Sequence, residues 1–242
     1  MKWTDERIKE FGDKLDNISS QIDSLKESYE SLKEYCESKK EPVVHLGANA
    51  RFITYRHTAG TTTSLLAYIK NYELEIGDKI TLIELKKYNN PTFVIVNIDN
   101  DGKYYLMPTS NLDVLPMHPS NCNWKCTCYE DSYMLHDTLG DFEDYFSNIT
   151  NIDLEHFEAT LASKEEIFGD EKSFPYFKAL FKEGREKYIK EFGKYSTFWL
   201  RTVYFRIRTA PPYFDLIDNI GEFYYNDASA SRGFRPLIIL ED

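Results

Sequence analysis

The feature that most constrains this chain is a run of apolar residues near its N-terminus, spaced alternately three and four positions apart. Its members are Ile8, Phe11, Leu15, Ile18, Ile22, Leu25, Tyr29, Leu32 and Cys36. Nearly all of the residues between them are charged or small and polar. An average spacing of 3.5 residues over four heptads predicts one helix whose narrow apolar stripe needs a partner. We call these nine residues the seam.

Two partners can cover the seam. One is the same helix from other copies of the chain, which gives a parallel coiled coil, and the other is the remainder of the same chain. The unbroken heptad period favours the coiled coil. Ile and Leu occur at both core positions of the heptad, which does not encode a dimer cleanly and favours a trimer. Gly12 and several serines lower the intrinsic helicity, so we expect the helix to depend on assembly.

After residue 41 the pattern changes. Pro42 ends the helical pattern, and short runs with period two or with β-branched residues follow. They predict strands at residues 51–56, 65–69, 79–85, 92–98, 103–107, 197–201, 213–217, 222–225 and 235–240. Helices are predicted at residues 135–146 and 172–192. This irregular order is typical of an α+β fold. We expect three parts: a coiled-coil oligomerisation or docking helix at 1–41, a linker or small β adapter at 42–73, and a domain at 74–242.

Charge and hydropathy exclude several classes of protein. The net charge is −11 over 242 residues, so a broad electrostatic grip on nucleic acid is not expected. The sequence has no uninterrupted apolar stretch of about 18 residues, so we expect no membrane insertion. The first residues lack an apolar signal region, which indicates synthesis in a cytosol and leaves open release by lysis or inside an assembled particle.

Catalytic and metal-binding patterns are weak. His118, Cys122, Cys126 and Cys128 form one compact group, and His136 is a fifth candidate, whereas a structural zinc site normally joins two such groups. We expect no metal, with zinc binding by these residues left as an open question. The histidines are scattered, and no nucleophile elbow or complete phosphate loop occurs. We therefore expect no catalytic residue, no cofactor and no enzyme.

The last part of the chain has the composition of a recognition surface. Between residues 195 and 234, aromatic residues are unusually dense and are interleaved with Asn, Asp, Ser and Arg. Tyrosine offers a large amphipathic contact area at low rotamer cost, and small polar residues adapt their hydrogen bonds. The alternative is that many of these rings fill a β core, and composition does not separate the two.

Several motifs resemble a family of uncharacterised domains in bacterial and phage proteins. The resemblance rests on Phe-Trp-Leu-Arg at residues 198–201 and Ser-Arg-Gly-Phe-Arg-Pro at residues 231–236, with a glycine turn at Gly221 between them. Looser matches are Glu-Ile-Gly-Asp at 75–78, Tyr-Glu-Asp-Ser at 129–132 and Leu-Ala-Ser-Lys-Glu-Glu-Ile-Phe at 161–168. Together they cover about residues 74–242.

This resemblance implies a C-type-lectin-like fold, akin to the formylglycine-generating-enzyme group and to the variable proteins of diversity-generating retroelements. In the latter, variable residues are displayed just before a Gly-Phe-Arg stretch, and the matching window here is 202–232. The paired-cysteine chemistry of the formylglycine enzymes is not expected, because no cysteine follows Cys128. Trp199, Arg201, Arg235 and Pro236 are expected to be scaffold, since a buried guanidinium must be paired.

The expected protein is thus a phage-type virion or tail-associated structural protein, on a tail fibre or baseplate. Its helix oligomerises it or docks it on other virion proteins, and its lectin-like domain binds a host surface glycan or protein for attachment. The expected ligand-binding residues are Tyr204, Phe205, Arg206, Tyr213, Asp218, Asn219, Tyr224, Tyr225, Asn226, Asp227 and Arg232. The alternatives are a decoration or cement protein that makes only particle contacts, and a metal-dependent or cell-wall enzyme.

Overall fold

The chain divides into two compact units, Met1–Pro42 and Val43–Asp242. The computed structural model describes residues 5–38, 42–56, 63–121, 126, 128–169, 171–192, 197–205, 213–218 and 221–242. Helices and strands are mixed without regular alternation, which confirms the α+β class. In the described residues, no helix has the length and apolar character needed to cross a membrane.

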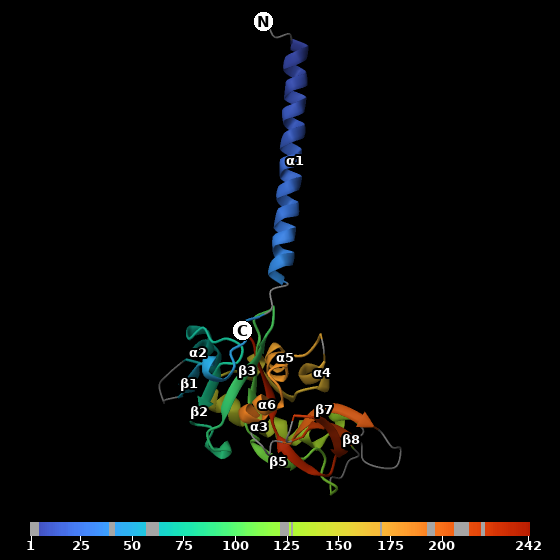
Figure 1. The fold of residues 1–242 in the computed structure, drawn as a ribbon. Coiled ribbons are helices and arrows are strands. Elements are labelled where there is room, and N and C mark those ends of the chain that lie inside the picture. The colour runs from blue at the N-terminus through green and yellow to red at the C-terminus, as the bar shows by residue number, and fades with distance from the viewer. Residues whose placement is uncertain are drawn as a thin grey trace. The chain divides into compact units, whose positions relative to one another are not determined.

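The first unit contains one helix, α1 (Asp5–Ser38), as the heptad pattern predicted (Figure 1). The seam side chains that the structure describes are exposed in the single chain: Leu15, Ile18, Ile22, Leu25 and Tyr29 are between 47% and 69% exposed. A coiled-coil partner for this stripe stays a prediction.

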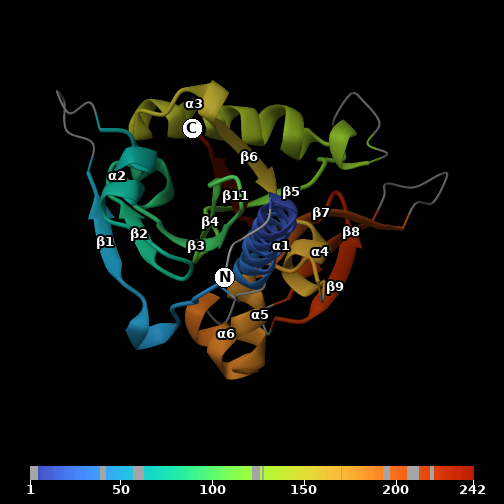
Figure 2. The ribbon, with the colours of Figure 1, turned by 90° about the horizontal axis from the view of Figure 1, so that it is seen from above.

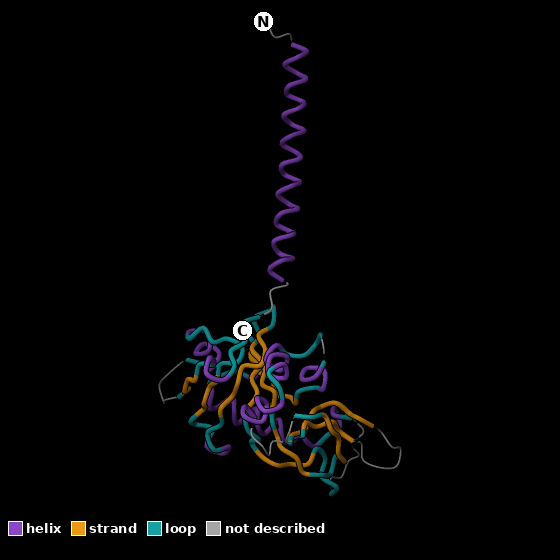
Figure 3. Tube along the Cα trace, viewed as in Figure 1, coloured by secondary structure: helices purple, strands orange, loops and turns teal. Residues whose placement is uncertain are grey.

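The second unit is built on two sheets (Figure 3). The larger has the order β1-β2-β3-β4-β11-β6. Its strands are β1 (Phe52–Tyr55), β2 (Lys79–Leu82), β3 (Thr92–Ile98), β4 (Tyr104–Pro108), β11 (Pro236–Leu240) and β6 (Phe157–Leu161). Only the β1–β2 pair is parallel. The last strand of the chain, β11, lies inside this sheet, between β4 and β6.

The smaller sheet has the order β5-β10-β7-β8-β9. Its strands are β5 (Asp113–Pro116), β10 (Ser231–Phe234), β7 (Phe198–Phe205), β8 (Tyr213–Ile217) and β9 (Phe223–Asp227). Among the strands that the structure describes, β9 is an edge strand that pairs with β8 alone. The chain passes from the smaller sheet to the larger one between β10 and β11, and Arg235 is the one residue that links these two strands.

Helices cover both faces of the larger sheet, as Figure 2 shows for α3 on one side and α5 and α6 on the other. The helices are α2 (Leu65–Asn71), α3 (Gly140–Thr150), α4 (Lys164–Phe168), α5 (Pro175–Lys182) and α6 (Arg185–Phe192), with a π-helical turn at Met134–Leu139 before α3. Short 3₁₀ turns lie at Gly47–Asn49, Lys86–Tyr88, Tyr129–Asp131 and Leu154–His156.

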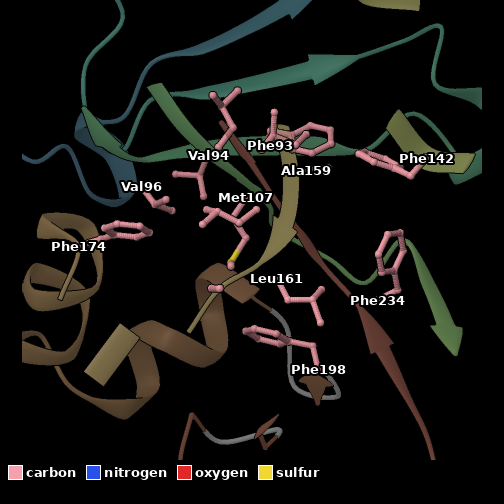
Figure 4. Packing of buried hydrophobic residues seen from close by; sticks show 14 of the residues in the cluster. Phe93, Val94, Val96, Met107, Phe142, Ala159, Leu161, Phe174, Phe198 and Phe234 are labelled. Atoms are coloured by element: carbon pink, nitrogen blue, oxygen red, sulfur yellow. The ribbon is translucent and has the colours of Figure 1, made fainter. Parts of the chain in front are cut away.

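The core joins both sheets to these helices. Phe142 of α3 lies next to Phe234 of β10 (Figure 4). Their rings pack edge-on, with centroids 5.8 Å apart. On the other face, Phe174 packs against Tyr105 at 5.3 Å. Both sheets therefore share one continuous apolar core.

A buried carboxylate ties the segment before β1 to the turn before β2. Asp78 is fully buried and accepts hydrogen bonds from the backbone N–H of Arg51 and Glu75 and from the Arg51 side chain. His45 Nδ1 lies 3.1 Å from the same carboxylate. Gly77 is required here, because its φ is +94° and a Cβ would lie 1.8 Å from the carbonyl oxygen of His45. Residues 43–56 thus belong to the same unit as β2.

Two of the predicted elements were wrong. Residues 65–69 form part of the helix α2 and not a strand. The Ser64 side chain caps this helix by accepting a hydrogen bond from the Ala67 N–H, and the helix buries Leu65 and Ile69 on one face. The predicted helix 172–192 is two helices, separated at Gly184, whose φ is +96°. The short strands β5, β6 and β10 and the helix α4 were not predicted.

Candidate functional site

Several of the motif residues of the C-terminal region are buried in the core. Trp199 is fully buried and donates its Nε1–H to the carbonyl of Leu115, at 2.9 Å, which links β7 to β5. Arg235 is fully buried between the rings of Phe192 and Phe198, whose centroids are 5.0 Å and 4.6 Å from its Cζ. Burial lowers the pKa of the Arg235 guanidinium to about 10.

The two arginines of the motifs have different partners: the Arg201 side chain is 30% exposed, whereas Arg235 is fully buried and its Nη1 has no hydrogen-bond partner among the described residues. Arg235 donates from Nε to Asn111 Oδ1 at 3.1 Å and from Nη2 to the Phe192 carbonyl at 3.2 Å. Arg201 donates to the Leu161 carbonyl and pairs with Glu166 Oε1, each at 2.5 Å. Carbonyl oxygens thus hold Arg235, and a carbonyl and a carboxylate hold Arg201, in agreement with their expected role as scaffold.

Two of the expected ligand-binding residues form turns. Asp218 accepts a hydrogen bond from the backbone N–H of Glu222 at 2.8 Å, which closes the turn between β8 and β9. Asp227 accepts from both the backbone N–H and the hydroxyl of Ser229, at 2.8 Å and 2.6 Å, after β9. Their carboxylates therefore shape the two ends of β9.

Three tyrosines gather around the edge strand, and we call Tyr213, Tyr224 and Tyr225 the tyrosine cluster. The rings of Tyr224 and Tyr225 are stacked, with centroids 5.4 Å apart and planes 11° apart. Tyr213 meets Tyr225 edge-on at 5.8 Å. Tyr224 is 57% exposed and Tyr225 is 38% exposed. The cluster is thus a partly exposed aromatic surface at the edge of the smaller sheet.

Beside this cluster lies a carboxylate that the sequence analysis missed. Asp215 is directly opposite Tyr225 in the β8–β9 register and two residues from Tyr213, so the three side chains leave the same face of the sheet. Asp215 is 2% exposed, and its Oδ1 has no hydrogen-bond partner among the residues that the structure describes. It also lies where the β7–β8 register shifts, between Trp199 and Val203.

The surroundings of Asp215 raise the pKa of its carboxyl group. Burial raises the pKa of the Asp215 carboxyl to about 6, with Lys164 opposing this effect and Glu165 adding to it. The Lys164 ammonium lies over the Phe223 ring, 3.6 Å from its centroid. The carboxyl therefore changes charge close to neutral pH, whereas a solvated aspartate does so near pH 4.

The other expected ligand-binding residues make local hydrogen bonds or lie where few atoms are described. Asn226 accepts a hydrogen bond from the N–H of Asp227 at 2.8 Å, and Arg232 donates to the carbonyl of Ser231 at 2.7 Å. Tyr204 and Phe205 end β7, where only the backbone is described. Two further residues lie outside the described residues, namely Arg206 and Asn219.

The histidine and cysteine group has local partners. His118 Nδ1 accepts a hydrogen bond from the Tyr133 N–H at 3.2 Å, and the Cys128 thiol donates to Asp131 Oδ2 at 3.3 Å. Cys122 lies outside the described residues. In the part of the chain that is described, no three His, Cys, Asp or Glu side chains are grouped to hold a metal ion.

A pocket of about 250 Å³ lies elsewhere in the same unit. It is lined by Ser64, Leu66, Asn151, Ile152, Asp153, His156, Glu241 and Asp242. None of the expected binding residues lines it. Two of its carboxylates already pair with lysines: Glu241 with Lys103, and Asp242 with Lys70.

Comparison with known proteins adds no relative. No family model matches the chain, and neither curated proteins nor solved structures gave a significant match. The candidate site therefore depends on its own geometry. The sequence did carry one signal for Asp215, since a single charged residue interrupts the otherwise apolar and aromatic strand at residues 213–217.

Proposed function

We propose that this chain is a multivalent attachment protein of a phage-type virion. In this proposal α1 joins several copies through the seam, and the edge of the smaller sheet in each copy binds a ligand on the host surface. The observation that carries the proposal is the partly exposed tyrosine cluster at the edge of a sheet whose inner strands are packed in the core.

The seam supports the assembly half of this proposal. Five of its side chains are largely exposed in the single chain, and covering each Leu or Ile would contribute roughly 1.5–3 kcal/mol. The occupant we propose is α1 from other copies, because the 3.5-residue period suits an identical helix along its whole length. Three copies are proposed, since Ile and Leu share both core positions.

The tyrosine cluster supports the binding half. Its rings are displayed by β8 and β9, whose ends are closed by the Asp218 and Asp227 turns. Behind them, Trp199 and Arg235 fix the neighbouring strands in the core. A rigid aromatic surface on a fixed scaffold loses little entropy when it binds. Several weak sites on one oligomer then give useful avidity.

The proposal also includes a lectin-like fold for the C-terminal domain and a location on the virion. A lectin-like domain on a tail fibre or baseplate of a virion would unite the motif resemblance with an oligomerising stalk and a recognition surface. Binding of a host surface glycan or protein would need no catalytic group, no cofactor and no metal.

Attachment to host cells tests the binding half. The triple variant Tyr224→Ala, Tyr225→Ala and Asn226→Ala should reduce attachment of the folded protein at least tenfold. The control is the double variant Phe52→Ala and Leu154→Ala, which removes exposed apolar side chains from other parts of the unit. Attachment of the triple variant at the level of the control would reject the site. If attachment persists while assembly into particles fails, the decoration or cement function takes its place.

A further inference from the structure

Asp215 is a buried carboxylate that the scaffold does not use. Its Oδ1 is fully buried without a hydrogen-bond partner in the described part of the chain, although the buried Asp78 in the same unit is fully engaged. Leaving such an acceptor unpaired costs about 1–3 kcal/mol. Glu84 and Arg235 also have a buried atom without a partner among the described residues, but Asp215 is the one beside the partly exposed tyrosine cluster, which points to a ligand there.

The groups around Asp215 define what that partner is. The rings of Tyr224 and Tyr225 are stacked, and Tyr213 stands edge-on beside Tyr225, which together make a partly exposed aromatic surface. Aromatic faces attract cations and also pack against the C–H groups of a sugar ring. A carboxylate next to such rings favours an ammonium group, whereas it repels carboxylates and phosphates.

We propose that the tyrosine cluster and Asp215 together bind an amino sugar whose amine is free, that is, a hexosamine without its N-acetyl group. The pyranose ring would pack on Tyr224 and Tyr225, and its ammonium group would pair with the Asp215 carboxylate. This inference rests on the proposed function and names the ligand class of the same site.

Access to the carboxylate is from the edge of the sheet. Tyr225 faces Asp215 from β9, and no strand of the described residues pairs with the outer side of β9. Asp215 is 2% exposed, so the ammonium group would reach it only after the Tyr225 side chain changes rotamer, and such changes are common when ligands bind. On the other side, α4 places Lys164 over Phe223. The ligand ammonium would therefore supply the hydrogen bond that Asp215 lacks.

The charged neighbours predict how binding depends on pH. Lys164 and Glu165 of α4 act on Asp215 with opposite signs, Tyr225 faces it from β9, and Arg201 of β7 is already paired with Glu166. With a carboxyl pKa of about 6, Asp215 is mostly ionised at pH 7 and mostly neutral at pH 5. The affinity for an ammonium ligand should fall roughly tenfold between these pH values.

The test is a titration of the full-length chain with three probes at pH 7 and physiological salt. Binding is measured by calorimetry or by ligand-observed NMR. The probes are D-glucosamine, N-acetyl-D-glucosamine and Nα-acetyl-lysine amide. We expect D-glucosamine to bind at least tenfold more tightly than the other two. Equal binding of the N-acetyl sugar would overturn the role of the ammonium group. Equal binding of the lysine derivative would overturn the role of the sugar ring.

Asp215→Asn should lower the affinity for D-glucosamine by about ten- to a hundredfold and remove the pH dependence. Asp101→Asn is the matched control, because it removes the same charge from an exposed turn between β3 and β4. Unchanged binding in Asp215→Asn, or a wild-type affinity that is level from pH 7 to pH 5, would overturn the inference. If the tyrosine variant abolishes host attachment while D-glucosamine does not bind, the ligand class fails and the proposed function stands.

Discussion

Replacing Asp78 by alanine should remove a large share of the stability of the Val43–Asp242 unit. The Asp78 carboxylate accepts two backbone hydrogen bonds, from Arg51 N–H at 2.9 Å and Glu75 N–H at 3.0 Å, and one from Arg51 Nε at 2.7 Å. His45 adds a fourth contact at 3.1 Å. Two backbone donors would lose their acceptor, at about 1–3 kcal/mol each. The Arg51 side chain is 43% exposed and stays solvated after the change, so the loss rests on the two backbone donors, and we expect about 3–5 kcal/mol.

Denaturant unfolding at several pH values measures this loss. Burial alone would raise the pKa of Asp78, but hydrogen bonds from Glu75, Arg51 and His45 hold it below its usual value. A lowered carboxyl pKa contributes stability above the pKa of the unfolded chain, and this contribution is lost as the pH falls through the folded-state pKa. The difference between wild type and Asp78→Ala should therefore be full at pH 7 and shrink below about pH 4.

Asp101→Ala serves as the control for Asp78, because Asp101 is an exposed turn residue and its removal should change the free energy of unfolding by less than about 0.5 kcal/mol. A loss below about 1 kcal/mol in Asp78→Ala would refute the reasoning. So would a difference between wild type and variant that does not change with pH.

Three further substitutions test other parts of the structure by denaturant unfolding. Gly233→Ala should destabilise the chain by about 2–4 kcal/mol, because the new Cβ would lie 2.2 Å from Asn111 Nδ2. The Asn111 side chain is fixed by hydrogen bonds with Thr197 and Arg235. An unchanged free energy of unfolding would contradict this prediction. Glu191→Ala should cost about 3–5 kcal/mol, because it leaves the Lys79 ammonium buried without its carboxylate, and Lys79→Met in the same chain should restore most of the loss. Asp215→Asn should stabilise the chain by about 1–2 kcal/mol at pH 7, because it removes a buried charge. The pKa of the wild-type Asp215 carboxyl is raised to about 6, so this gain should shrink as the pH falls through about 6. A gain that stays constant between pH 7 and pH 5 would contradict this prediction.

Local patterns predicted those elements whose residues alone decide the structure. The seam predicted α1, and the β-branched run at residues 92–98 predicted β3. Trp199 and Arg235 were expected to be scaffold because their size or charge leaves few other places for them. Each of these inferences depends on residues that are near in sequence or on the cost of burying one side chain.

Elements decided by distant contacts were missed. The apolar run at 65–69 fits a strand or a helix equally, and the Ser64 cap and the burial of Leu65 and Ile69 select the helix. The strands β5 and β10 are only four residues long and exist because they pair with each other across more than a hundred residues. Asp215 was missed because its significance lies in an absent hydrogen-bond partner, which no spacing of residues reveals.

The mass of the full-length chain in solution tests the central claim most directly. Analytical ultracentrifugation should give three times the 28.4 kDa of one chain over a wide range of concentrations. The double variant Leu15→Asp and Ile22→Asp should give the monomer mass with the sheets still folded, whereas Ser20→Asp with Ser24→Asp, outside the seam, should keep the oligomer. A wild-type chain that stays at 28.4 kDa at high concentration would contradict the account.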